Sequence, residues 1–108
     1  MSLVSNIVGT INKYGRDVRL INGDTEILTG AFIEPLRYKN KIYIGGEYRN
    51  LKGTDRYLYV GKPKLFKLKE GETLIEESGI KYLVERTESY IVNDEVIYDW
   101  AIIKSLWS

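Results

Sequence analysis

The residues best suited to acid–base chemistry in this chain are two pairs of glutamates. Glu76 and Glu77 are adjacent, and Glu85 and Glu88 are three residues apart. Two carboxylates that face each other can share a proton, as a catalytic carboxylate dyad does. In a strand, neighbouring side chains point to opposite faces. We therefore expect neither pair to act together, unless a bulge changes the spacing of Glu85 and Glu88.

Most other catalytic chemistry is absent from the sequence. It contains no His and no Cys. This removes the commonest general base, thiolate nucleophiles, and zinc sites built from Cys or His. The sequence also lacks a G-x-x-x-x-G-K-[ST] phosphate-binding loop. We predict a protein that is not an enzyme, with no cofactor and no metal, and interpret the glutamates as solvated strand faces.

Binding of single-stranded nucleic acid is a second kind of chemistry, suggested by the basic segment 37–69. Its Lys and Arg residues are interleaved with Tyr38, Tyr43, Tyr48, Tyr57 and Tyr59. Barrels that bind oligonucleotides combine a positive groove with aromatic rings on which bases stack. Tyr57 and Tyr59 also share a strand face with apolar neighbours, so core packing explains them equally well. Nucleic-acid binding through segment 37–69 is kept as an alternative function.

Charge is segregated along the chain. Residues 37–69 hold ten Lys and Arg and two acids, a formal charge of +8, and residues 70–99 hold nine Asp and Glu and two bases, a charge of −7. Because like-charge stretches repel, the blocks either pair inside one fold or present opposite faces to other molecules. In a head-to-tail ring, the basic face of one copy would meet the acidic face of the next. The sequence leaves both arrangements open.

Length and periodicity predict one small β domain. The 108 residues, 44% of them apolar, are typical of a single soluble globular domain, and no apolar run is long enough to span a membrane. Apolar residues from Leu3 to Tyr14 recur at three- and four-residue steps, which predicts a helix over residues 1–15 with a left-handed cap at Gly15.

The remaining sequence alternates with period two between turn signals. Asn22-Gly23, Ser78-Gly79 and Asn93-Asp94 are predicted hairpin turns. Pro35 predicts a strand edge or a bulge. Residues 45–55, rich in Gly and charge, are predicted to form a long projecting loop. About seven short strands indicate a small antiparallel barrel or sandwich, of which we take the β-barrel.

Four segments in chain order carry a family resemblance. They are Ala-Phe-Ile-Glu-Pro-Leu-Arg-Tyr at 31–38, Arg-Tyr-Leu-Tyr-Val-Gly-Lys-Pro at 56–63, Gly-Ile-Lys-Tyr-Leu-Val at 79–84 and Tyr-Asp-Trp-Ala-Ile-Ile at 98–103. Together they resemble the small head-closure and head–tail connector proteins of tailed phages, including prophages and phage-like elements of Gram-positive bacteria. The chain departs from the family pattern where Lys62 interrupts a Gly-Pro pair and where Trp100 precedes the alanine of the last strand.

The resemblance implies a non-enzymatic β-barrel that assembles as a homo-oligomeric ring with portal, adaptor or tail proteins. Such a protein would be found in the bacterial cytoplasm during assembly and then in the virion or phage-like particle, with no membrane partner. Family members project a long loop into the channel, which matches residues 45–55. This loop would face neighbouring subunits or packaged DNA. The candidate interaction residues of the loop and of the basic face are Tyr48, Arg49, Asn50, Lys52, Lys62, Lys64 and Lys67.

Overall fold

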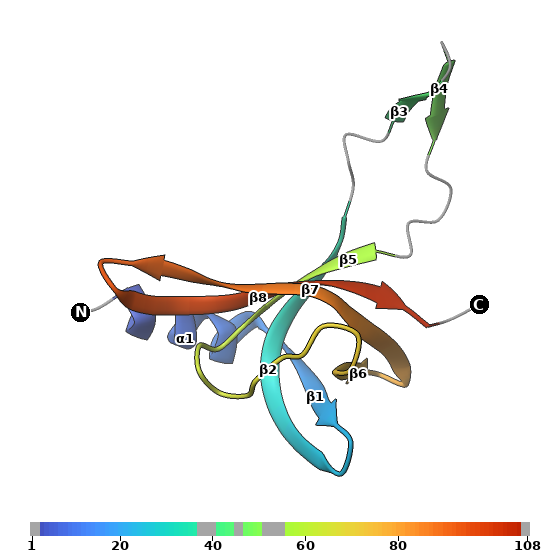
Figure 1. Ribbon diagram of the computed structural model, residues 1–108. Helices are drawn as coiled ribbons and strands as arrows, with labels where there is room; N and C mark the ends of the chain where they lie inside the picture. The colour runs from blue at the N-terminus through green and yellow to red at the C-terminus, as the bar shows by residue number, and fades with distance from the viewer. Residues whose placement is uncertain (1–2, 37–40, 45–46, 51–55, 107–108) are drawn as a thin grey trace.

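The computed structural model describes residues 3–36, 41–44, 47–50 and 56–106 (Figure 1). One helix precedes eight strands: α1 (Leu3–Tyr14), β1 (Arg16–Asn22), β2 (Thr25–Pro35), β3 (Lys41–Ile44), β4 (Glu47–Asn50), β5 (Arg56–Gly61), β6 (Leu74–Glu77), β7 (Ile80–Val92) and β8 (Glu95–Ser105). Among the described residues, no helix is long and apolar enough to cross a membrane.

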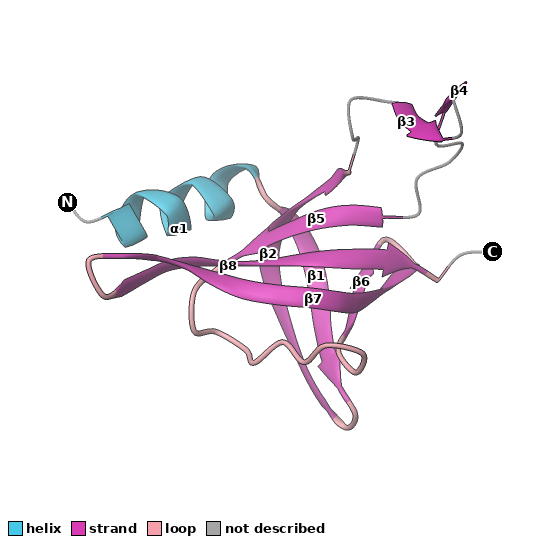
Figure 2. Cartoon of the chain, turned by 45° about the horizontal axis from the view of Figure 1, so that its top comes forward, coloured by secondary structure: helices cyan, strands magenta, loops and turns pink. Residues whose placement is uncertain are grey.

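Six of the strands close into an antiparallel barrel in the order β1-β2-β5-β8-β7-β6 (Figure 2). The closing seam lies between β1 and β6, where Leu20 is paired with Ile75. Strands β3 and β4 form a separate two-stranded sheet. The predicted mainly β fold with an antiparallel barrel and an N-terminal helix is therefore confirmed. The described residues form eight strands rather than about seven.

Alternate residues of the barrel strands fill its interior. This alternation follows from the two-residue period of a strand. Ten buried residues make up the main core cluster, and they come from all six barrel strands: Val18, Leu20, Ala31, Ile33, Tyr59, Ile75, Tyr82, Val84, Ala101 and Ile103. Ile11 of α1 and Ile97 of β8 are also buried outside this cluster, and α1 packs against β2 and β8.

The strand order forces the chain to cross one end of the barrel. In the closed order, β5 lies between β2 and β8, and β6 lies between β1 and β7. Strands β5 and β6 are consecutive in the barrel sequence but lie on opposite sides of it. The segment that joins them must therefore span the opening, and Phe66 and Leu68 of that segment pack against the core.

Two of the three predicted hairpin turns occur where the sequence places them, and the third is shifted by one residue, because Asn22 is paired with Thr25 and the turn is Gly23-Asp24. Ser78 and Gly79 join β6 to β7 with φ angles of 51° and 85°, and Asn93 and Asp94 join β7 to β8 with 50° and 65°. Positive φ at both central residues is the signature of a type I′ turn, whose twist suits an antiparallel hairpin. These two short turns place β6, β7 and β8 side by side.

Two local predictions differ from the structure, and the edge position predicted for Pro35 is found. Gly15 does not have a positive φ. Its N–H donates to Ile11 O at 2.8 Å, and a Cβ there would lie 3.1 Å from Ala31 N, so close approach of the helix end to β2 requires glycine. The sequence predicts one strand from Thr25 to Leu28 and another from Ala31 to Tyr38, but Thr25–Pro35 form the single strand β2. Pro35 is the last residue of that strand, where β1 no longer pairs.

The predicted loop of residues 45–55 is not loop throughout. Residues Glu47–Asn50 form strand β4, which pairs antiparallel with β3 from Lys41 opposite Asn50 to Ile44 opposite Glu47. The sequence lacks period-two alternation over β4, which is why it predicts no strand there. Residues 45–46 and 51–55 lie outside the described part of the chain.

The interior of the barrel depends on a close contact between Tyr59 and Gly61. These residues are two positions apart on β5 and point to the same side. Tyr59 is 2% exposed, and a Cβ on Gly61 would lie 2.5 Å from its ring carbon Cζ and would overlap its hydroxyl. The tyrosine ring therefore occupies the space that any other residue at position 61 would need.

Replacing Gly61 with alanine should destabilise the protein by about 1–3 kcal/mol, the usual effect of overpacking a close-packed core. Gly9→Ala is the matched control, because Gly9 is exposed in α1 and a Cβ there would meet no neighbour within 4 Å. Alanine there should stabilise the protein by about 0.5–1 kcal/mol. Chemical denaturation of both variants measures the difference. Equal effects would show that Tyr59 does not restrict position 61.

Candidate functional site

The basic connector, defined as residues 62–69 between β5 and β6, carries four lysines and no acid. Lys64 and Lys67 are exposed, and Lys62 is partly exposed. Because Phe66 and Leu68 pack against the core, this segment is held at the barrel end while its amines reach solvent. The connector thus presents a formal charge of +4 on a fixed backbone.

Side chains at the barrel end hold the connector in place. Asn22 Nδ2 donates to Lys67 O at 2.8 Å, and Lys69 N donates to Thr73 Oγ1 at 2.7 Å. Thr73, which is fully buried, donates in turn to Asn22 Oδ1. The three bonds link β1, the connector and the start of β6. Such a network fixes the backbone because buried polar groups are costly to leave unpaired.

The lysines of the connector take part in no ion pair with any described residue. Among the described residues, an ion pair between Arg56 and Glu85 joins the basic block to the acidic block. The acids of β6 pair instead with arginines of β1, which lie outside the basic block. Pairing of the two blocks within one chain therefore involves Arg56 and leaves the connector with its charge.

The glutamates of β6 point to opposite sides of their strand, as predicted. Glu77 Oε1 lies 2.9 Å from Arg16 Nη1, and Glu76 Oε1 lies 3.4 Å from Arg19 Nη1. The Glu77 side chain is only 11% exposed, whereas that of Arg16 is 65% exposed. Each carboxylate has its own arginine, so the two are not arranged to share a proton.

The glutamates of β7 are affected by a bulge between Val84 and Arg86. The bulge inserts Glu85 as an extra residue, which is the exception that the sequence allowed for. Glu85 pairs with Arg56, and Glu88 Oε1 lies 3.5 Å from Arg86 Nη2. These carboxylates are therefore bound to different arginines. Within the described residues, no three acidic side chains are grouped so that they could hold a metal ion.

The rings of Tyr57 and Tyr59 on β5 are the two candidate platforms on which bases could stack. Tyr59 belongs to the barrel core, and Tyr57 packs against that core. Tyr59 is buried, and burial followed by the charge of Asp99 raises its pKa. The rings of Tyr57 and Tyr82 meet edge to face with their centroids 5.0 Å apart. Core packing is thus the correct interpretation of Tyr59, and the nucleic-acid alternative loses that stacking surface.

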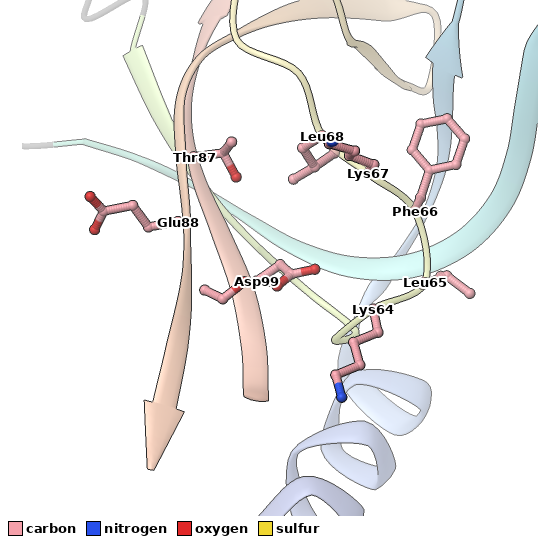
Figure 3. Close-up of a pocket in the computed structure, with 9 residues that line it drawn as sticks. Lys64, Leu65, Phe66, Lys67, Leu68, Thr87, Glu88 and Asp99 are labelled. Atoms are coloured by element: carbon pink, nitrogen blue, oxygen red, sulfur yellow. Dashed lines mark hydrogen bonds between the residues drawn. The ribbon is translucent and has the colours of Figure 1, made fainter. Parts of the chain in front are cut away.

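A pocket of about 400 Å³ separates the connector from the base of the β7–β8 hairpin (Figure 3). Asp99 points toward the connector, and Glu88 points away from it. Ser89 Oγ donates to Asp99 Oδ1 at 2.6 Å, and Thr87 Oγ1 donates to Trp100 O at 2.9 Å. Asp99 is therefore hydrogen-bonded to the neighbouring strand β7. The pocket is lined by Lys64, Leu65, Phe66, Lys67, Leu68, Thr87, Glu88, Ser89 and Asp99.

The candidate loop residues are only partly covered by the structure. Tyr48, Arg49 and Asn50 lie on β4, opposite Tyr43, Ile42 and Lys41 of β3. Lys52 falls outside the described residues. The structure thus places three of these residues on one short hairpin and the connector lysines at the barrel end.

Sequence reasoning misses two features of this site. Lys69 belongs to the connector but is not among the candidate residues, although its spacing from Lys67 is visible in the sequence. The Asn22–Thr73 hydrogen bond joins residues far apart in the chain, and the sequence marks Asn22 only as a turn residue. No local signal could have revealed that bond.

Comparison with known proteins adds no relative to this geometry. No family model, no curated protein and no solved structure matches the chain. The case for function therefore rests on the sequence and on the arrangement of the described residues.

Reversing the connector charge with Lys62→Glu, Lys64→Glu and Lys67→Glu together should change the free energy of unfolding by less than about 1 kcal/mol. The reason is that these lysines make no described ion pair, and solvated charges contribute little to stability. Urea denaturation of the triple variant and the wild type measures the difference. A loss of several kcal/mol would show instead that the connector charge is paired inside the monomer.

Stability should fall at alkaline pH because burial raises the pKa of Tyr59. The raised pKa keeps folded Tyr59 neutral, so its contribution is complete below about pH 10, the ordinary pKa of tyrosine. The contribution is lost as the pH rises above that value, because the unfolded chain ionises first. Tyr59→Phe should reduce this loss in denaturation series up to about pH 11. Part of the loss should remain in this variant, because the pKa of Tyr82 is also raised, mainly by burial. A pH profile identical to that of the wild type would contradict the contribution assigned to Tyr59.

Proposed function

We propose that this protein is a non-enzymatic structural subunit of the head–tail junction of a tailed phage or prophage. In this proposal it assembles as a ring with portal, adaptor or tail proteins. Its working parts are surfaces rather than a reaction centre: the β3–β4 hairpin at one end of the barrel and the basic connector at the other.

The observation that carries the proposal is the separate β3–β4 sheet. The hairpin is inserted between β2 and β5, which are themselves neighbours in the barrel. Figure 1 draws it beyond the barrel, where the resemblance to connector proteins expects a projecting segment. A pair of strands that contributes nothing to barrel closure is well suited to contact another molecule.

The elongated shape and the unpaired charge support an assembly role. The Cα radius of gyration is 15.2 Å, whereas a compact domain of this length has a radius of about 13 Å. Segments that leave the barrel increase the surface available for partners. The connector lysines add a charged face that the described part of the monomer does not neutralise, and such faces select partners and orientation more than they add affinity.

The β3–β4 hairpin can be removed without opening the barrel. Leu36 N donates to Arg56 O at 3.0 Å, and Pro35 is paired with Tyr57. Replacing residues 37–55 with Asn-Gly should therefore close β2 and β5 with a two-residue turn. We expect the variant to keep its thermal unfolding transition and to lose co-assembly with a portal–adaptor complex.

Co-sedimentation and electron microscopy of rings measure the co-assembly. A wild-type protein that never joins the portal, adaptor or tail proteins would contradict the proposed function. A hairpin-deleted variant that assembles like the wild type would show that the β3–β4 hairpin is not the contact. Genes for a terminase, a portal and a tail tube next to this gene would identify the partners to test.

A further inference from the structure

The longest hairpin of the barrel extends past the strands that flank it. Strand β8 pairs with β5 only from Asp99 onward, and β7 pairs with β6 only up to Leu83. Residues 88–99, here called the arm, therefore include a ribbon whose two strands pair only with each other. Isolated two-stranded ribbons are marginally stable in water. Helix α1 packs against β8, and Ile97 of the arm is buried.

The arm is acidic and has an exposed apolar surface. It carries four acids and no base, a formal charge of −4. Asp94 and Glu95 at its tip form no ion pair with any described residue, whereas Asp99 and Glu88 at its base have partners. Tyr90 is 47% exposed and stacks on Tyr98 with ring centroids 5.0 Å apart. Ile91 beside it is 58% exposed.

The arm and the connector are complementary. The connector carries +4 and the arm −4, and neither the connector lysines nor the tip acids are paired in the described part of the chain. Leu65, 44% exposed, gives the connector an apolar side chain to set against Tyr90 and Ile91. Opposite free charges on two separate segments, the connector and the arm tip, favour a heterologous contact, which repeats from copy to copy and forms a ring where its rotation closes.

We infer that the arm of one copy of this chain docks on the basic connector of the next copy. The acids of the tip lie against Lys64 and Lys67, and the exposed Tyr90 and Ile91 lie against Leu65. The inference rests on the proposed ring assembly and names the contact that builds it. A contact of a few side chains is weak on its own, and ring closure supplies the remaining stability.

The other exposed acidic turn is a poorer partner for the connector. Asp24 and Glu26 lie at the β1–β2 turn, which is also exposed. Asn22, at the start of that turn, bonds to the connector backbone of its own chain. This bond fixes the turn against the connector of its own chain, whereas among the described residues no hydrogen bond or ion pair joins the arm tip to the connector. The turn offers a control with the same change of charge.

Two variants with opposite defects test the contact. Lys64→Glu with Lys67→Glu replaces two connector lysines with acids. Asp94→Lys with Glu95→Lys replaces the two acids of the arm tip with lysines. In low salt, analytical ultracentrifugation should show weak self-association of the wild type and a loss of at least about tenfold in either variant. A mixture of the two should associate again, because the unchanged arm of one variant meets the unchanged connector of the other and the reversed arm meets the reversed connector.

Analytical ultracentrifugation of further variants supplies the controls. Asp24→Lys with Glu26→Lys should leave self-association unchanged. A single chain that carries all four connector and arm substitutions should regain the self-association that each pair of substitutions removes. A wild type that stays monomeric at about 1 mM in low salt, or a mixture that does not associate, overturns the inference. If these variants still co-assemble with the portal like the wild type, the proposed function holds and the arm–connector contact is refuted. If self-association depends on these charges but the protein does not bind the portal, only the proposed function is refuted.

Discussion

The whole structure depends on the seam that closes the barrel between β1 and β6. It joins Arg19 to Glu76, Leu20 to Ile75 and Ile21 to Leu74, residues far apart in the sequence. Leu20 and Ile75 are buried, so the hydrophobic effect holds the seam. The flanking ion pairs are partly exposed and contribute little by comparison. Once the seam is closed, β5 and β6 lie on opposite sides and the connector must cross the barrel end.

The distribution of free charge follows from this closure. Because β1 is the neighbour of β6, the acids Glu76 and Glu77 are matched by Arg19 and Arg16. The acidic block is therefore partly neutralised by residues outside the basic block. The connector lysines are left at one end of the molecule, and the acids of the arm tip are left beyond the barrel. The segregation seen in the sequence thus leaves free charge of opposite sign on the connector and on the arm tip.

Features with a local cause could be predicted from the sequence. The spacing of apolar residues before Tyr14 indicated the helix, and the turn residues Ser78-Gly79 and Asn93-Asp94 indicated two hairpins whose φ angles fit type I′ turns. Features that depend on partners distant in sequence could not be predicted. The position of Tyr59 against Gly61 is set by closure of the barrel, and strand β4 is defined by pairing with β3 rather than by alternation of its own residues.

The central claim is that charge left free in the monomer is used between copies, and zero-length cross-linking tests it most directly. A carbodiimide joins an amine to a carboxylate only where they are in contact. In rings assembled from isotope-labelled and unlabelled chains, the account predicts mixed-isotope peptides that join Lys64 or Lys67 to Asp94 or Glu95. Cross-links confined to single chains, or rings in which the connector lysines join other residues, would contradict it.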